Sequence, residues 1–403
     1  MKRRCFVHDY RGRSIYLITL EVAGRRRLLG RVRGADASCA GPGVAVTEIP
    51  LSVSGLGEVE LSAINAWLFE PSELGRRVAD EFMKIGEHVP GVKPLLAQAM
   101  PDHFHGILFV TREIKRTLGS IIAGFKGKCS QVARELGASE ALTRLAPDRG
   151  TGDLVRLVPD RAGAGAVKVS LWEEGFHDRI LTSEGQLEKM FRYVRDNPRR
   201  LALRLKYPDL FTSVRCLAGH GHAFEAFGNG FLLQSDAIVQ VQCSRRFFGF
   251  KREEKAGLTP DAPNRRLKVT RGVAFETPEF IAKKAELFAA AKKGAVLCSP
   301  CISDGEKAIA YAAVDAGHSL IVLRNEPFPP RFKPSGRFFD ACAEGRLLML
   351  CPQGLTPRAQ NGGRQPVRIT RAECLALNAI VAEICGGNAG DIVYQVADNL
   401  RRK

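Results

Sequence analysis

Two histidines within one short segment are well placed to bind a metal ion. The segment reads Met100-Pro-Asp-His-Phe-His-Gly-Ile-Leu-Phe-Val110, and its apolar second half predicts a strand. Alternate side chains of a strand point to one face, so His103 and His105 project together, about 7 Å apart along the chain, while Phe104 faces the core. Two imidazoles at this spacing form half of a metal site. Alternatively, they are ordinary polar residues at the start of a strand.

A tyrosine and an asparagine further along the chain can complete this site. Tyr193 and Asn197 are four residues apart in a segment that predicts a helix from Ser183 to Arg195, ended by Pro198. At this spacing both side chains lie on one face of a helix. A tyrosine beside a metal ion is a candidate nucleophile, and Asn197 is a candidate third ligand. The alternative for Tyr193 is packing on an amphipathic helix.

The elements that must position these residues alternate between strands and helices in the first half of the chain. A segment rich in Gly, Ala, Asp and Arg, residues 138–165, predicts an irregular loop or insertion. The expected strands are residues 14–22, a basic strand near 27–33, two strands around Pro101 within 95–110, and 167–172. The expected helices, besides the one that carries Tyr193, are residues 71–87 and 114–136. This order predicts an α+β domain with helices on one face of an antiparallel sheet.

The second half of the chain has a more regular pattern after His220. The expected helices are residues 278–293, 304–316, 336–345 and 371–385, and the expected strands are 294–299, 318–323 and 346–351. Such alternation is typical of a doubly wound parallel sheet, that is, a Rossmann-like α/β domain. We therefore expect two domains, residues 1–219 and 220–403. The Gly-x-Gly-x-x-Gly fingerprint is missing, so no dinucleotide cofactor is predicted.

The composition favours a nucleic-acid partner. The 403 residues include 60 Lys+Arg against 43 Asp+Glu, and the formal net charge of +17 has the sign that attracts phosphate. An anionic membrane surface would also attract this charge. However, no basic amphipathic helix with an aromatic face is evident, and no apolar run approaches the roughly 18–20 residues of a spanning helix. The 11 scattered cysteines indicate buried thiols in a reducing compartment, so we expect a cytoplasmic protein.

Several basic residues near the histidine segment are candidate contacts to a nucleic-acid backbone. They are Arg112, Arg116, Lys126 and Lys128. Trp172 is a candidate stacking surface for an unpaired base. The alternatives are a solvated helix face for the basic residues and a position in the core for Trp172.

In their order along the chain, these motifs resemble the single-tyrosine HUH transposases, especially the REP-associated tyrosine transposase group. The resemblance covers about residues 10–212. It is carried by Ile15–Thr19, Met100–His105, Phe125-Lys126, Leu171-Trp172 with Phe176–Asp178, and Tyr193 with Asn197-Pro198. The family usually has Asn where this chain has Asp102, and it lacks the loop at 138–165.

The resemblance implies a ferredoxin-like fold and metal-dependent cleavage of single-stranded or hairpin DNA. In that reaction Mg²⁺ or Mn²⁺, held by His103 and His105 with Asn197, polarises the scissile phosphate while Tyr193 attacks phosphorus. The products are a 5′-phosphotyrosine and a free 3′-OH, and a second strand can reverse the step, as DNA transposition and recombination require. The resemblance is compatible with a homodimer and with a monomer.

Two other functions are open at the level of sequence. The first is a DNA-binding protein derived from such a transposase, which holds DNA without cutting it. The second is a nucleotide-sensing domain with an accessory basic module. The sequence contains all four candidate site residues, His103, His105, Tyr193 and Asn197. This favours the transposase-like enzyme, because a binding protein would not need all four.

The second domain carries two further motifs, and it weakly resembles the Rossmann-like domain of the DNA-processing protein A family. Ser303 and Glu306 have the spacing of a helix-capping box, although the same helix N-terminus is also a candidate phosphate site. Cys298 and Cys301 have the spacing of a redox motif or of half a zinc site. Because no second pair accompanies them, buried thiols are the favoured interpretation.

Overall fold

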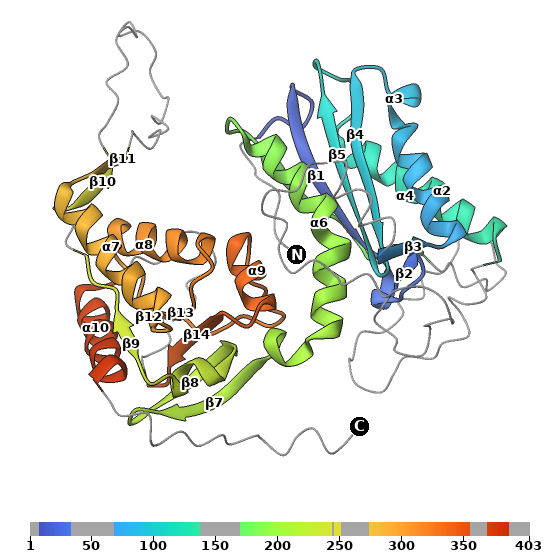
Figure 1. Ribbon diagram of the computed structural model, residues 1–403. Helices are drawn as coiled ribbons and strands as arrows, with labels where there is room; N and C mark the ends of the chain where they lie inside the picture. Colours follow the sequence, from blue (N-terminus) through green and yellow to red (C-terminus); the bar gives the residue numbers. More distant parts are fainter. Residues whose placement is uncertain are drawn as a thin grey trace, which may run out of the picture. The chain divides into compact units, whose positions relative to one another are not determined.

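The computed structural model describes residues 8–33, 68–137, 170–243, 246–250, 274–354 and 369–386. The chain divides into two compact units, Met1–Lys206 and Tyr207–Lys403 (Figure 1). This division lies earlier than the expected boundary at 219/220, because β7 (Ser213–Gly219) pairs with β8 (His222–Gly228) in the sheet of the second unit. The loop expected at 138–165 lies outside the described residues.

An antiparallel four-stranded sheet forms the centre of the first unit. Its strands, in spatial order, are β4 (Val92–Met100), β5 (His103–Val110), β1 (Ser14–Glu21) and β6 (His177–Leu181). All neighbouring strands are antiparallel, which confirms the predicted antiparallel α+β architecture. A second, two-stranded sheet contains β2 (Gly30–Val32) and β3 (Phe69–Pro71).

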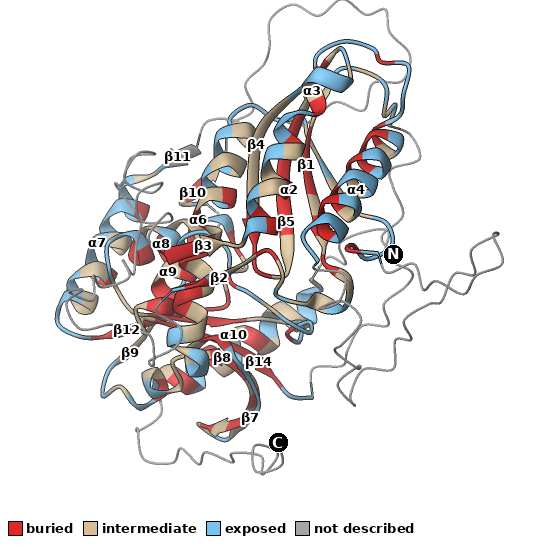
Figure 2. Ribbon diagram, turned by 90° about the vertical axis from the view of Figure 1, so that its right-hand side faces the viewer, coloured by how far each residue is buried: buried red, intermediate tan, exposed pale blue. Residues whose placement is uncertain are grey.

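Helices cover both faces of the larger sheet, whereas only one covered face was expected (Figure 1). On one side lie α2 (Glu73–Met83), with the short α3 (Ile85–His88) after it, and α4 (Leu118–Glu135). The rings of Phe82, Phe104 and Phe125 pack there, with centres 5.0–5.7 Å apart. Figure 2 shows the corresponding alternation of buried and exposed residues along α4. The other side is covered by α6 (Gln186–Lys206), where Val194 packs against Leu17 and Ile107.

Helix α6 continues through Pro198 instead of ending before it, as the sequence pattern predicted. Proline has no N–H and therefore removes one hydrogen bond from the helix interior. Burial of Val194, Ala202 and Leu203 on both sides of Pro198 offsets that loss, because tertiary packing contributes most of the stability of helices in proteins.

The strand expected at 167–172 is also corrected. In its described part, residues 170–172, only an isolated bridge between Trp172 and Val22 forms. The fourth strand of the sheet is β6, which begins at His177.

The second unit contains a six-stranded sheet with a parallel core. In spatial order the strands are β7, β8, β14 (Leu347–Pro352), β13 (Leu320–Leu323), β12 (Val296–Ser299) and β9 (Ile238–Gln240). The last four are mutually parallel, as predicted for three of them, and β8 is antiparallel to β14. The remaining short elements are β10 (Phe248–Phe250), β11 (Ala274–Glu276), and the 3₁₀ helices η1 (Ala23–Arg25, in the first unit), η2 (Pro208–Phe211) and η3 (Gly230–Gln234).

The parallel strands follow one another without reversal, from β9 to β14, so the sheet is not doubly wound in the strict sense. Right-handed crossovers then place the connecting helices on one face. These helices are α7 (Pro278–Lys292), α8 (Asp304–Asp315) and α9 (Arg337–Ala343). The other face is covered by α10 (Arg371–Gly386), through Leu377, Val381 and Ile384. No helix in the described ranges combines the length and apolarity that crossing a membrane requires.

Candidate active site

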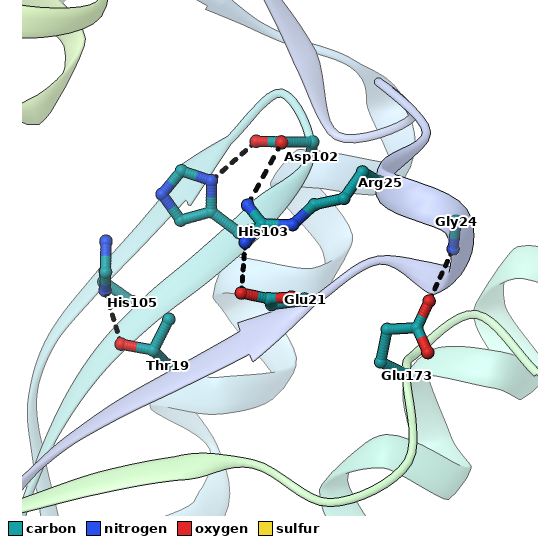
Figure 3. A network of polar contacts seen from close by, with 8 residues as sticks. All are labelled: Thr19, Glu21, Gly24, Arg25, Asp102, His103, His105 and Glu173. Carbon is teal, nitrogen blue, oxygen red and sulfur yellow. Dashed lines mark hydrogen bonds and ion pairs between the residues drawn. The ribbon is translucent and has the colours of Figure 1, made fainter. Parts of the chain in front are cut away.

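The pairing of β1 with β5 determines the surroundings of the two histidines. His103 and His105 lie on one face of β5, as predicted, with ring centres 4.8 Å apart (Figure 3). Across the sheet, His103 is opposite Glu21 and His105 is opposite Thr19. Ile107, the next residue on this face, packs against α6. The histidines therefore occupy the polar end of the face that α6 covers.

Each imidazole uses its Nδ1 atom in a hydrogen bond to a neighbouring side chain. Nδ1 of His105 lies 2.9 Å from Oγ1 of Thr19, and Nδ1 of His103 lies 2.6 Å from Oδ1 of Asp102 (Figure 3). A neutral imidazole that donates from Nδ1 keeps its lone pair on Nε2. Metal-binding histidines generally show this arrangement, with the second nitrogen bonded to a protein oxygen.

Asp102 also belongs to a chain of charged groups. Nη1 of Arg25 donates to Oδ2 of Asp102 at 3.3 Å, and Nη2 of Arg25 pairs with the carboxylate of Glu21. Burial alone would raise the pKa of Asp102. The hydrogen bond from His103 and the positive charges of His103 and Arg25 outweigh burial and lower this pKa to about 2. Asp102 is thus a carboxylate at neutral pH.

Helix α6 brings Tyr193 to the histidines. The ring centre of Tyr193 lies 6.1 Å from that of His105, and 39% of the residue surface is exposed. The guanidinium of Arg200, two helical turns further along, lies 5.9 Å from the same ring centre. Tyr193, the candidate nucleophile, therefore lies next to the candidate metal ligand His105 and the positive charge of Arg200, and solvent can reach it.

Asn197 lies on α6 one turn after Tyr193. Its Nδ2 atom is buried and has no hydrogen-bond partner within the described ranges of the chain. Nδ2 is a donor and would pair with an acceptor, whereas a metal ion would be bound by the Oδ1 atom of the same amide. Across the described residues, no three His, Cys, Asp or Glu side chains are grouped to hold a metal ion. Two imidazoles and an amide nevertheless form a donor set that fits a labile divalent ion.

The predicted DNA contacts are not gathered around the histidines. Arg112 and Arg116 follow the opposite end of β5 from His103, beyond roughly 23 Å of strand. Lys126 and Lys128 lie on α4, which covers the other face of the sheet. The ammonium of Lys126 already donates to the backbone oxygens of residues 173 and 175, at 2.5 and 2.9 Å.

Trp172 does not offer a stacking surface. Only 2% of it is exposed, and its ring packs at 6.5 Å from both Phe104 and Phe125. The expectation of base stacking is therefore wrong for this residue, and the alternative of a position in the core is confirmed. The large apolar ring is more stable among the neighbouring phenylalanines than in water.

Sequence reasoning missed several groups around the site. Thr19, Glu21 and Arg25 come from β1 and the following turn, about 80 residues before the histidines in the chain. Only the strand register brings them together, and no local pattern encodes that register. Arg200 had a usable signal, because a residue seven positions after Tyr193 lies on the same face of a helix.

In the second unit, the capping interpretation of Ser303 and Glu306 is confirmed. Oγ of Ser303 accepts from the Glu306 amide at 3.1 Å, and the Glu306 carboxylate accepts from the amides of Ile302 and Ser303 at 2.8 and 3.0 Å. This carboxylate thus takes N–H groups that a bound phosphate would need. The Cys298 and Cys301 thiols are free, and burial raises the pKa of Cys301 to about 11.

No protein-family model matches the chain, and no curated protein is detectably similar to it in sequence. Among solved structures, the chain is similar to a Deinococcus radiodurans R1 protein that carries the provisional description of a transposase. The two are 13% identical with a TM-score of 0.23, and the match covers 49% of this chain and 96% of that chain. A likeness at this level carries no conclusion about function.

Proposed function

We propose that the first unit is a metal-dependent tyrosine endonuclease and strand transferase of the HUH transposase type, acting on single-stranded or hairpin DNA. The observation that carries this proposal is that Tyr193 lies beside the two histidines. The ring centres of Tyr193 and His105 are 6.1 Å apart, and those of His105 and His103 are 4.8 Å apart. The three side chains come from two elements that are distant in the chain. Simple packing does not require a partly exposed tyrosine beside two imidazoles.

The topology supports the same family. The strand order β4-β5-β1-β6, with α2 before β4 and α4 before β6, is the order of two interleaved βαβ units. We infer that the first unit has a ferredoxin-like fold, to which α6 adds the tyrosine. The parallel strands of the second unit likewise support a Rossmann-like description.

The proposed reaction is a transesterification at phosphorus. A bond forms between Oη of Tyr193 and phosphorus while the bond from phosphorus to the 3′-oxygen breaks. The phenol proton is lost, and the 3′-oxygen takes up a proton and leaves as a 3′-OH. The strand with the 5′-phosphate stays on the tyrosine, and a 3′-OH from a second strand can reverse the step without ATP. Arg200 holds positive charge beside the tyrosine during this exchange.

The residues that would hold a divalent ion are His103 and His105, through Nε2, and Asn197, through its amide. When bound there, Mg²⁺ or Mn²⁺ supplies Lewis-acid polarisation of the scissile phosphate. Contacts to the DNA backbone are proposed for Arg112, Arg116 and Lys128, on DNA that extends beyond the site. Lys126, the fourth expected contact, is not included in this proposal, because two carbonyl groups hold its ammonium.

Covalent trapping tests this function. Full-length protein is incubated with a pool of end-labelled hairpin DNAs and Mn²⁺, and the protein is then denatured. We expect a labelled adduct that Tyr193→Phe lowers by at least about 10³-fold and that His103→Ala also lowers strongly. Tyr311→Phe is a matched control, since this tyrosine of the second unit is 42% exposed. DNA binding without any adduct would instead support the non-catalytic DNA-binding protein.

A further inference from the structure

A pocket of the second unit lies beyond the carboxyl ends of two neighbouring parallel strands. Gln242 and Cys243 line it directly after β9, and Glu306 lines it from the first turn of α8, which follows β12. The volume of the pocket is about 750 Å³. Pockets of this size and position take small organic ligands in α/β proteins. The groups that line the pocket then determine which class of ligand fits.

Negative charge predominates among the lining residues. One face of α7 contributes Glu279, Lys283 and Glu286, and Glu306 adds a third carboxylate. Nζ of Lys283 lies 3.1 Å from Oε2 of Glu286, so these two charges compensate each other. A hydrogen bond from the Thr277 side chain, followed by one from the backbone amide of Glu279 itself, lowers the pKa of Glu279. Glu279 and Glu306 therefore leave the pocket with an excess of negative charge.

Two acceptor atoms of the pocket have no donor among the described residues. Glu306 is 5% exposed, and the amides of Ile302 and Ser303 both donate to its Oε2 atom, at 2.8 and 3.0 Å. The Oε1 atom of Glu306 therefore stays available to a donor in the pocket. On α10, Oδ1 of Asn378 is buried and has no hydrogen-bond partner in the part of the chain that the structure describes. Buried polar atoms are normally paired, so a ligand with N–H groups would satisfy both acceptors.

The lining groups fit neither a phosphate nor a metal ion. Carboxylates repel phosphate, and the Glu306 carboxylate already takes amide groups at the start of α8. A metal ion needs closely grouped ligands, and no three His, Cys, Asp or Glu side chains of the described residues form such a group. Ala282 and Phe247 line the pocket with apolar surface, which suits methylene groups. The pocket thus matches a flexible organic cation with an aliphatic chain.

We propose that this pocket is a binding site for an aliphatic polyamine. The ammonium groups of the polyamine pair with Glu306 and Glu279 and donate to Oδ1 of Asn378. Its methylene chain lies along Ala282 and Phe247. Ammonium groups donate hydrogen bonds and accept none, which matches a pocket whose unpaired groups are acceptors. The inference is independent of the proposed function, since every residue that it uses belongs to the second unit.

Calorimetric titration of the full-length, DNA-free protein with spermidine tests this site. We expect saturable binding at about 0.15 M salt, where weak attraction between exposed charges is screened. Glu306→Gln should weaken binding at least about 10-fold, because it removes the charge while its amide oxygen can still cap α8. Glu279→Gln should cause a smaller loss, at most about 5-fold, since Glu279 is exposed. Asn378→Leu removes the buried acceptor at similar volume and should also weaken binding.

Glu383→Gln is the matched control and should bind spermidine like the wild type, because this carboxylate of α10 pairs with His222 outside the pocket. The proposal is overturned if the wild type does not bind spermidine, or if Glu306→Gln and Glu279→Gln bind it as tightly as the wild type. If Glu306→Gln does not fold, Glu279→Gln and Asn378→Leu carry the test. A parallel titration uses AMP as the probe. Tighter binding of AMP than of spermidine would also overturn the proposal and would support the nucleotide-sensing alternative.

Discussion

Neighbouring groups decide what each titratable side chain of this protein can do. His103 and His105 have the same place on the pleat of β5, but one donates to a carboxylate and the other meets a hydroxyl. Tyr193 stays 39% exposed on a helix that is otherwise packed against the sheet through Val194 and its neighbours. Neighbouring groups also shift the pKa of His318 in the second unit, and this shift makes the stability of that unit depend on pH.

His318 should make the second unit less stable in mild acid. Burial, followed by the positive charges of Lys292 and Arg346, lowers the pKa of His318 below its usual 6.5. Between the lowered pKa and 6.5 the unfolded chain therefore binds more protons than the folded chain, so stability falls as the pH drops below about 6.5. His318→Gln removes this titration. Melting curves at pH 7.5 and 5.5 should show a smaller acid-induced decrease in the variant, whereas equal decreases would contradict the assignment.

At the scale of elements, the sheet of the first unit separates chemistry from packing by face. Phe104 and the histidines alternate along β5, so the ring of Phe104 contacts α2 and α4 while the imidazoles lie under α6. Gly106 continues the apolar side. A Cβ atom at this position would lie 2.2 Å from the ring of Phe82, which is therefore packed directly on the backbone of the histidine strand.

Gly106→Ala should destabilise the first unit by about 1–3 kcal/mol, because the added methyl group forces the buried Phe82 ring to move. Gly124→Ala on α4 is the control, since a Cβ atom there meets nothing within 4 Å. Alanine in an exposed helix position should stabilise it by up to about 1 kcal/mol. Urea unfolding measures both changes. A Gly106→Ala variant as stable as the wild type would show that Phe82 does not pack as described.

Most elements of both units could be predicted from local patterns, and the failures have physical causes. The mostly apolar segment 95–110, broken by Pro101, predicted β4 and β5, and the periodicity at 114–136 predicted α4. The end of α6 was wrong because tertiary burial outweighs the local effect of Pro198. Likewise, the one-faced sheet was wrong because the apolar stripe of α6 supplies a second covered face.

The candidate site was predictable only where a single element carries it. The shared face of His103 and His105 followed from the strand period, and the face of Tyr193 and Asn197 from the helix period. The contacts of Thr19 and Arg25 depend on long-range pairing between β1 and β5, which no short pattern reveals. Trp172 was named from residue type alone, and its burial follows from the cluster with Phe104 and Phe125.

At the scale of the whole molecule, the net charge of +17 belongs to two separately packed units. Part of the positive charge is neutralised within each unit, as in the pairs of Arg76 with Glu73 and Arg337 with Asp315. Other basic groups, such as Lys126, are held by carbonyl oxygens. The formal charge therefore predicts attraction to DNA, but only individual variants identify the groups that replace counterions.

DNA binding should depend steeply on salt. For single strands, log K falls with log[salt] with a slope of about −0.7 per neutralised phosphate, so about five contacts give a roughly 10²-fold loss of affinity between 50 and 200 mM salt. Tyr193→Phe in EDTA allows this to be measured without cleavage. Arg200→Gln should make the slope shallower by about 0.7 if this arginine beside Tyr193 contacts a phosphate. Lys126→Gln should leave the slope unchanged, because two carbonyl oxygens already hold its ammonium. The reverse pattern would move the DNA path from the α6 face of the sheet to the α4 face, and a flat salt dependence would exclude phosphate contacts as the main source of affinity.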